Sequence, residues 1–158
     1  MDLRYYMSLA LEQAASAAAA GEVPVGAALL VPTAGEPRLF CAANATEAQN
    51  SSLAHAELLV LHQAAQACRR RYFENATLFV TMEPCPACAG AIVLARVGRV
   101  VYGCPDSRWG ACGSIFNVPE HPASGFRPQL IGGVMEEECR SLLQSFFRDI
   151  RRNNTKEP

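Results

Sequence analysis

The chain has 158 residues, of which 50% are hydrophobic and 18% are charged, and its formal net charge at pH 7 is −1. This length suits a single domain over residues 1–158 that can bury a core of its own, and the composition is typical of a globular protein. The near-neutral charge argues against a strongly basic nucleic-acid-binding protein, although it stays compatible with a local basic patch.

The cysteines and the apolar runs indicate where the protein works. Seven cysteines are an odd number, which does not suit the disulfide framework of a small secreted domain. Charged residues interrupt the alanine-rich stretch from Met1 to Gly21, so it lacks the continuous apolar segment of a signal peptide. No apolar run approaches the length of a membrane span. We therefore expect a protein of the reducing cytoplasm that has no membrane partner.

Hydrophobic periodicity, interrupted by glycine and proline, predicts four helices and five strands. In chain order these are a helix over 3–19, strands over 25–31 and 38–43, a helix from about 51 to 70, a strand over 76–81, a helix from 86 to about 95, strands over 99–102 and 129–131, and a helix that begins at 136. Ser51 and Ser52 are the expected N-caps of the second helix. Loops as long as residues 104–128 are usually functional. The order of elements predicts a sheet with helices on both faces.

Two short motifs, His55-Ala56-Glu57 and Pro84-Cys85-Pro86-Ala87-Cys88, contain the residue types of a zinc hydrolase. His55, Cys85 and Cys88 would supply three ligands and leave the fourth tetrahedral position of zinc open for water. Glu57 could take a proton from that water and return it to the substrate. Because Glu57 follows His55 by two positions, both side chains reach one metal only if their helix points its N-terminus at it.

Other interpretations of these residues stay open. A single C-x-x-C pair also occurs in redox proteins. A structural zinc site would need a fourth protein ligand, for which Cys104 and Cys112 are the candidates. The chain would then be a zinc-stabilised binding module without turnover, but such a module has no use for Glu57 beside its metal.

Together, H-x-E and a downstream P-C-x-x-C form the signature of zinc nucleobase deaminases, and the chain resembles the bacterial tRNA adenosine deaminases well beyond this signature. The similar segments are Glu22–Ala27, Asn44, His55–Glu57, Thr81–Cys85, Cys88–Ala91, Gly98–Gly103, Gly110–Ser114 and Leu142–Arg148. The resemblance implies a three-layer α/β/α cytidine-deaminase-like fold with a five-stranded mixed sheet, one zinc ion per subunit and a homodimer. It also implies conversion of adenosine to inosine at the wobble position of a tRNA anticodon, in which zinc-activated water attacks C6 of adenine, Glu57 carries the protons and ammonia leaves.

The resemblance further implies three substrate contacts. Asn44 corresponds to a base-contacting asparagine, and Val25 to a residue of the pocket wall. Asp106 corresponds to an acidic residue near the sugar of the target nucleotide, where a carboxylate can accept a hydrogen bond from a ribose 2′-OH. Alternatively, Asn44 and Asp106 are ordinary loop residues, and Val25 only packs in a strand.

Five more residues are RNA-binding candidates because of their own chemistry. Arg108 and Trp109 offer a charge and a stacking face to unstacked bases. Phe147, Arg148 and Arg151 place an aromatic ring beside cations on the final helix, which suits phosphate binding. Trp109 could instead be buried against a dimer partner, and the phenylalanine could belong to the core.

One departure from the family and one rival function remain at this stage. Where the bacterial family commonly has Asn-His-Arg near the end of the long loop, this chain has Gly125-Phe126-Arg127. The nearest rival is a free-base or nucleoside deaminase of the same fold, acting on guanine, cytosine or cytidine. The aromatic and basic residues of the final helix favour RNA, because an enzyme for small molecules needs neither.

Overall fold

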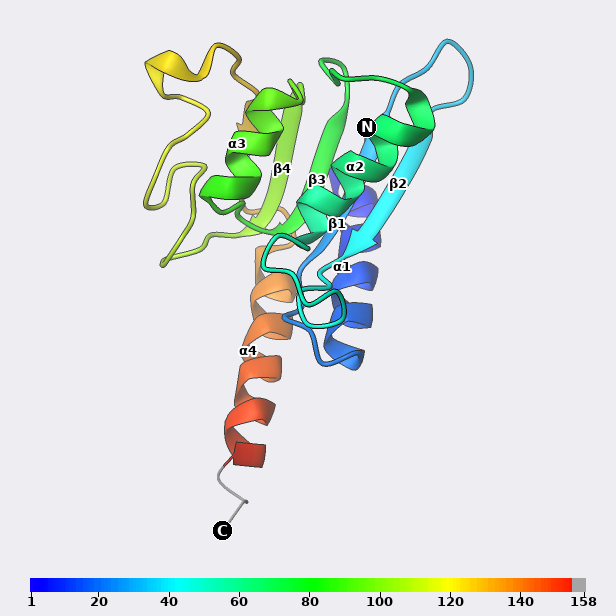
Figure 1. Cartoon of the computed structure of the whole chain (residues 1–158). Helices are drawn as coiled ribbons and strands as arrows, with labels where there is room; N and C mark the ends of the chain where they lie inside the picture. The colour runs from blue at the N-terminus through cyan, green and yellow to red at the C-terminus, as the bar shows by residue number, and fades with distance from the viewer. Residues whose placement is uncertain (155–158) are drawn as a thin grey trace.

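The computed structural model describes residues 1–154, which form one five-stranded sheet between two layers of helices (Figure 1). The strands are β1 (Gly26–Val31), β2 (Arg38–Ala43), β3 (Thr77–Met82), β4 (Arg99–Cys104) and β5 (Gln129–Ile131). The helices are α1 (Leu3–Ala19), α2 (Ala56–Cys68), α3 (Pro86–Leu94), α4 (Glu136–Asn154) and the single 3-10 turn η1 (Pro122–Ser124).

The sheet is mixed and has the strand order β2-β1-β3-β4-β5. β1 runs antiparallel to both of its neighbours, β2 and β3, whereas β3, β4 and β5 are parallel to one another. Helices α2 and α3 cover one face of the sheet, and α1 and α4 cover the other (Figure 1). The three-layer α/β/α fold and the five-stranded mixed sheet predicted from the sequence are therefore confirmed.

The core lies on both faces of the central strands. Leu78 and Val80 of β3 pack against α2 and α3, through residues such as Ile92, while Phe79 between them packs against α1 on the opposite face. Successive strand residues point to opposite faces. Because both faces are covered by helices, β3 is buried along almost its whole length, and its apolar residues at the centre are consecutive rather than alternating.

The start of helix α2 differs from the prediction. The helix begins at Ala56, with His55 as its N-cap, and neither Ser51 nor Ser52 caps it. The hydroxyl oxygen of Ser51 instead accepts a hydrogen bond from the Leu53 N–H, 3.3 Å away, which closes a local turn. Serine is favoured both at helix starts and in turns, and here the turn takes its side chain.

The termini of these elements determine where a site can form. The parallel strands β3 and β4 end at the same edge of the sheet, with Met82 paired to Cys104. β3 is followed immediately by the start of α3, and α2 begins beside it, since the N-cap residues of the two helices are in contact. Ligands of open α/β sheets commonly bind at the carboxyl ends of the strands.

Candidate active site

The N-cap residues of two helices meet at this edge of the sheet. His55 precedes α2, Cys85 precedes α3, and Cys88 lies in the first turn of α3. The Nδ1 atom of His55 lies 3.6 Å from the Sγ atom of Cys85 and 3.4 Å from that of Cys88. Within residues 1–154, these three side chains form the group whose ligand atoms all lie within 4.8 Å of one another.

The spacing of these atoms fits a zinc ion. With Zn–N bonds of about 2.0 Å and Zn–S bonds of about 2.3 Å, a tetrahedral site places its nitrogen and sulfur ligands roughly 3.5 Å apart. The two observed nitrogen–sulfur distances lie on either side of this value. Neither Cys104 nor Cys112 belongs to the group in the described part of the chain. The geometry therefore favours an open three-ligand site over a closed structural one.

Electrostatics prepare one of the two thiols for a metal. The hydrogen bond from the Cys88 thiol, opposed by burial and supported by His55, holds the pKa of Cys85 at about 4. The same hydrogen bond, together with burial, raises the pKa of Cys88. The hydrogen bond to Cys85 also raises the pKa of His55. The two sulfur atoms thus share a proton, which a metal that requires thiolates would displace.

Glu57 lies beside this group without belonging to it. It occupies the first turn of α2 and is only 4% exposed, and burial is the main cause that raises the pKa of its carboxyl group. Its side chain and that of His55 line the same cavity, because the start of α2 points toward the three ligand residues. A buried carboxyl group whose pKa is moved toward neutrality suits a residue that both accepts and returns a proton.

The cavity has a volume of about 200 Å³. That is smaller than the roughly 300–1,000 Å³ of pockets for drug-sized ligands, so it can hold one base-sized group while a longer chain stays outside. Its wall is formed by Val23, Val25, Asn44, Thr46, His55, Glu57, Met82, Glu83, Cys85 and Asp106. The structure thus brings three predicted substrate residues, Val25, Asn44 and Asp106, to the group that could bind the metal.

Asn44 is held in place by a second buried carboxylate. Its Nδ2 atom lies 3.4 Å from Glu22, which also accepts hydrogen bonds from the Thr46 hydroxyl, at 3.2 Å, and from the backbone N–H of Ala48, at 2.7 Å. The bond from Ala48 is the main cause that lowers the pKa of Glu22, with smaller contributions from Glu47 and Thr46 that act against burial. Glu22 therefore fixes the loop that carries Asn44.

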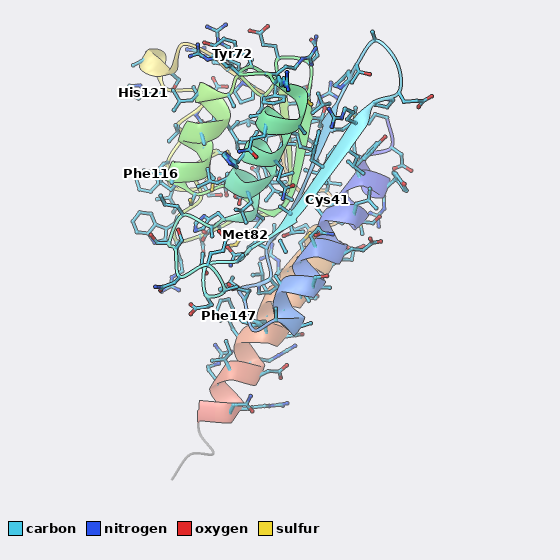
Figure 2. The ribbon with its side chains drawn as sticks, turned by 45° about the vertical axis from the view of Figure 1, so that its right-hand side comes forward. Cys41, Tyr72, Met82, Phe116, His121 and Phe147 are labelled. Atoms are coloured by element: carbon cyan, nitrogen blue, oxygen red, sulfur yellow. The ribbon has the colours of Figure 1, made fainter. Side chains whose placement is uncertain are left out.

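Four of the remaining predicted residues lie in a groove between α4 and the loop after β4. Its walls are formed by Arg108, Leu143, Gln144, Phe147, Arg148 and Arg151. Phe147 on α4 lies at the same end of the molecule as Met82, whereas Tyr72 and His121 lie at the opposite end (Figure 2). The aromatic and basic residues predicted to contact RNA are thus near the cavity but outside it.

Trp109 lines neither the cavity nor the groove. The residue is 60% exposed, and its ring stacks on that of Phe116, with ring centroids 6.1 Å apart. The sequence interpretation also gave no role to Glu22 or Glu83, although both lie in segments that resemble the family. For Glu83, the sequence offered one signal of a role, which is that this carboxylate directly follows an apolar strand.

The fold and the His-Cys-Cys group agree with a family model that defines the class of this protein. The family model of the cytidine and deoxycytidylate deaminase zinc-binding region matches residues 1–104. A tRNA-specific adenosine deaminase of Bacillus subtilis is 42% identical over 147 residues, which span 93% of this chain and 89% of the relative. The chain belongs to the family of tRNA-specific adenosine deaminases.

Solved structures match this chain at two levels of similarity. One from studies of A-to-I editing by tRNA:A34 deaminases superposes with a TM-score of 0.82 and 36% identity, over 88% of this chain and 99% of the other. A guanine deaminase of Nitrosomonas europaea reaches a TM-score of 0.71 with 22% identity, over 90% of this chain and 83% of the other, and shares the fold alone. None of the helices within residues 1–154 has the length and apolarity needed to cross a membrane.

Proposed function

We propose that this protein deaminates adenosine to inosine at the wobble position of a tRNA anticodon. The reaction consumes one water molecule, replaces the amino group at C6 of adenine by oxygen and releases ammonia. The observation that carries the proposal is that the His55-Cys85-Cys88 group lies at one base-sized cavity, which His55, Cys85 and Glu57 line. The proposed substrate is that of the tRNA-specific adenosine deaminase relatives and of the similar A34 deaminase structure.

The residues of the cavity have separate tasks in this reaction. Zinc, when held by His55, Cys85 and Cys88, lowers the pKa of a water molecule to about 7 and so supplies a nucleophile at neutral pH. Glu57 takes the proton of this water on a carboxylate oxygen, passes it to the ring nitrogen of adenine and later protonates the departing amine. The buried position of Glu57 keeps this proton away from bulk water.

The remaining contacts would hold the RNA. Asn44 and Val25 border the base, and Asp106 can accept a hydrogen bond from the ribose 2′-OH. Outside the cavity, a groove that combines cations with an aromatic face suits the phosphates and unstacked bases of flanking nucleotides. It is formed by Arg108, Phe147, Arg148 and Arg151. Trp109, which is next to Arg108 in the sequence and largely exposed, offers a further stacking face.

We also propose one zinc ion per subunit, a single domain over residues 1–158, a homodimer and a cytoplasmic location. The homodimer rests on the resemblance to the family. Light scattering measures the oligomeric state directly.

A substrate panel tests the function. We expect the protein to release ammonia from an anticodon stem-loop with adenosine at the wobble position, and not from the same stem-loop with guanosine there. Turnover of free guanine, cytosine or cytidine at comparable kcat/KM would instead support the rival deaminase. A zinc-binding module would turn over none of them.

Glu57→Ala tests the mechanism on the same panel. Loss of a positioned acid–base group lowers the rate by roughly 10²–10⁴-fold, while the three metal ligands remain, so we expect full zinc content without ammonia release. Retained activity would contradict the role of Glu57.

A further inference from the structure

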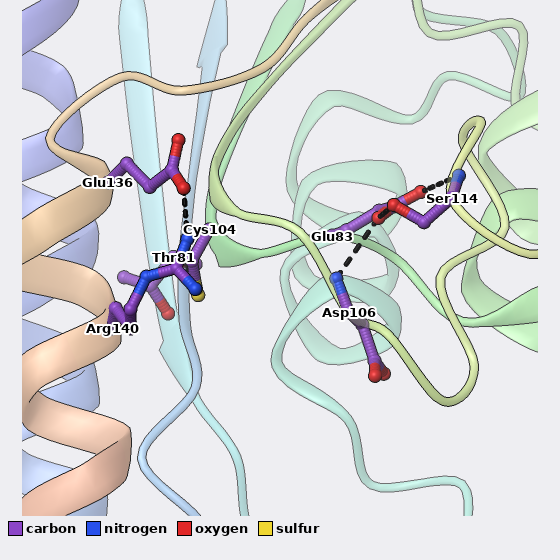
Figure 3. A network of polar contacts seen from close by, with 7 residues as sticks. All are labelled: Thr81, Glu83, Cys104, Asp106, Ser114, Glu136 and Arg140. Atoms are coloured by element: carbon purple, nitrogen blue, oxygen red, sulfur yellow. Dashed lines mark hydrogen bonds and ion pairs between the residues drawn. The ribbon is translucent and has the colours of Figure 1, made fainter.

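Glu83 is a buried carboxylate in the wall of the cavity, but it has no part in the deamination steps described above. It directly follows β3, is 3% exposed and lies outside the group that could bind the metal. Its Oε1 atom accepts hydrogen bonds from the backbone N–H groups of Cys112 and Ser114, each 3.0 Å away. Its Oε2 atom accepts one from the Asp106 N–H, 3.1 Å away, and one from the Ser114 hydroxyl (Figure 3). A carboxylate can accept all four bonds.

All four donors belong to one segment, residues 106–114 of the long loop. Gly110 in the middle of this segment packs directly against the carboxylate, since a Cβ atom there would overlap Glu83 Oε2 and the Asp106 carbonyl oxygen. The Ala111 N–H adds a bond of 2.8 Å to the carbonyl oxygen of Pro84, next to Glu83. The path of the segment therefore follows the position of this one side chain.

The same segment connects the cavity and the groove. Asp106 lines the cavity beside His55 and Glu57, whereas Arg108 lines the groove beside α4. The two residues are joined by a bond of 2.8 Å from the Arg108 N–H to the Asp106 carboxylate. A displacement of the segment would thus change the shape of the cavity and of the groove together.

From this arrangement we propose that Glu83 is a positioning residue for the RNA substrate. It holds residues 106–114 so that the cavity receives the target nucleotide while the groove binds the nucleotides that flank it. This inference rests on the proposed function. It predicts that weakening the hold of Glu83 impairs binding of a polynucleotide more than it impairs the chemical step.

Glu83→Gln is the first test, because the amide keeps the size of the side chain but points an NH₂ group at N–H donors. With a wobble-adenosine stem-loop, we expect KM to rise roughly tenfold and kcat to change less than about threefold, the pattern of lost uniform binding. Zinc content should stay at one ion per chain. Glu120→Gln is the matched control, because Glu120 lies in the same loop on the surface, 3.9 Å from Arg127.

Gly110→Ala is a second test that leaves every charge in place. The added methyl group pushes the segment away from Glu83, so we expect the same rise in KM. Thermal melting of each variant establishes that it is folded. An unchanged KM in both folded variants would overturn the inference, and so would a loss of zinc from folded Glu83→Gln, since the residue would then serve the metal site. Wild-type protein that is inactive on the stem-loop would refute the proposed function itself.

Discussion

The packing of helix α3 leads to a quantitative prediction. Ile92 lies one turn after Cys88 and is fully buried between α3 and the sheet. Ile92→Ala deletes three carbon atoms, whose transfer from water is worth about 0.8 kcal/mol each, or about 2.4 kcal/mol together. The cavity left behind adds to this, so we expect the free energy of unfolding to fall by about 3–4 kcal/mol. For a chain of this size, the thermal midpoint should fall by roughly 10 °C.

Leu94→Ala is the matched control, because Leu94 lies two residues further along the same helix and is 79% exposed. It deletes the same number of atoms, but we expect the free energy of unfolding to change by less than about 0.5 kcal/mol. Urea unfolding of zinc-loaded protein, followed by circular dichroism, measures both variants. The measurement is repeated over a range of protein concentrations, because a second subunit covering Leu94 would make its cost depend on concentration. If Leu94→Ala costs as much as Ile92→Ala where the protein is monomeric, the assignment of the buried face is wrong.

Three further predictions concern the metal, the pH dependence of stability and the backbone. Cys88→Ser should lower the zinc content measured by atomic absorption and abolish ammonia release; full zinc content would contradict its role as a ligand. The folded-state pKa of Glu22 lies below its ordinary 4.5, so its stabilisation is present above that pH and is lost as the pH falls through the folded value. The melting temperature of Glu22→Gln should therefore be lower than wild type at pH 7 and approach it below about pH 4.5, whereas the exposed control Glu47→Gln should match wild type throughout; a constant gap would contradict this reasoning. Gly26→Ala should destabilise the fold, because its Cβ would overlap α1. Gly90→Ala inside α3, where a Cβ meets nothing, should stabilise the fold by about 0.5–1 kcal/mol. Thermal melting checks both, because the midpoint should fall for the first variant and rise for the second.

Much of the fold was predictable from local patterns. The apolar run around Leu78, Phe79 and Val80 predicts a buried strand, and β3 is that strand. The turn over residues 45–54 was not predictable in this way. Its path depends on Asn50 in a left-handed conformation and on a hydrogen bond between Ala45 and Ala54. The N-cap of the second helix, His55, consequently lies four residues after Ser51.

The residues of the candidate site also differ in whether local sequence patterns predict them. His55, Cys85 and Cys88 could be selected from the sequence, because zinc binds through Cys and His side chains and paired cysteines at short spacing are typical of its sites. Glu83 could not be assigned a role, because its partners lie more than 20 residues along the chain and a carboxylate does not specify which loop will supply its donors. The stacking of Trp109 on Phe116 is likewise a contact between side chains that no helical or strand period relates.

The two buried carboxylates beside the cavity have a consequence for evolution. Glu83 and Glu22 each receive backbone N–H groups from a neighbouring loop, from Asp106 and Cys112 in one case and from Ala48 in the other. Every amino acid except proline offers this donor. Side chains on both loops that make no such contact themselves, unlike Gly110, Ser114 and Thr46, can therefore be exchanged while the loops keep their shape. The catalytic residues need not change. A fold held in this manner can acquire new substrates by mutation at the rim of the cavity alone.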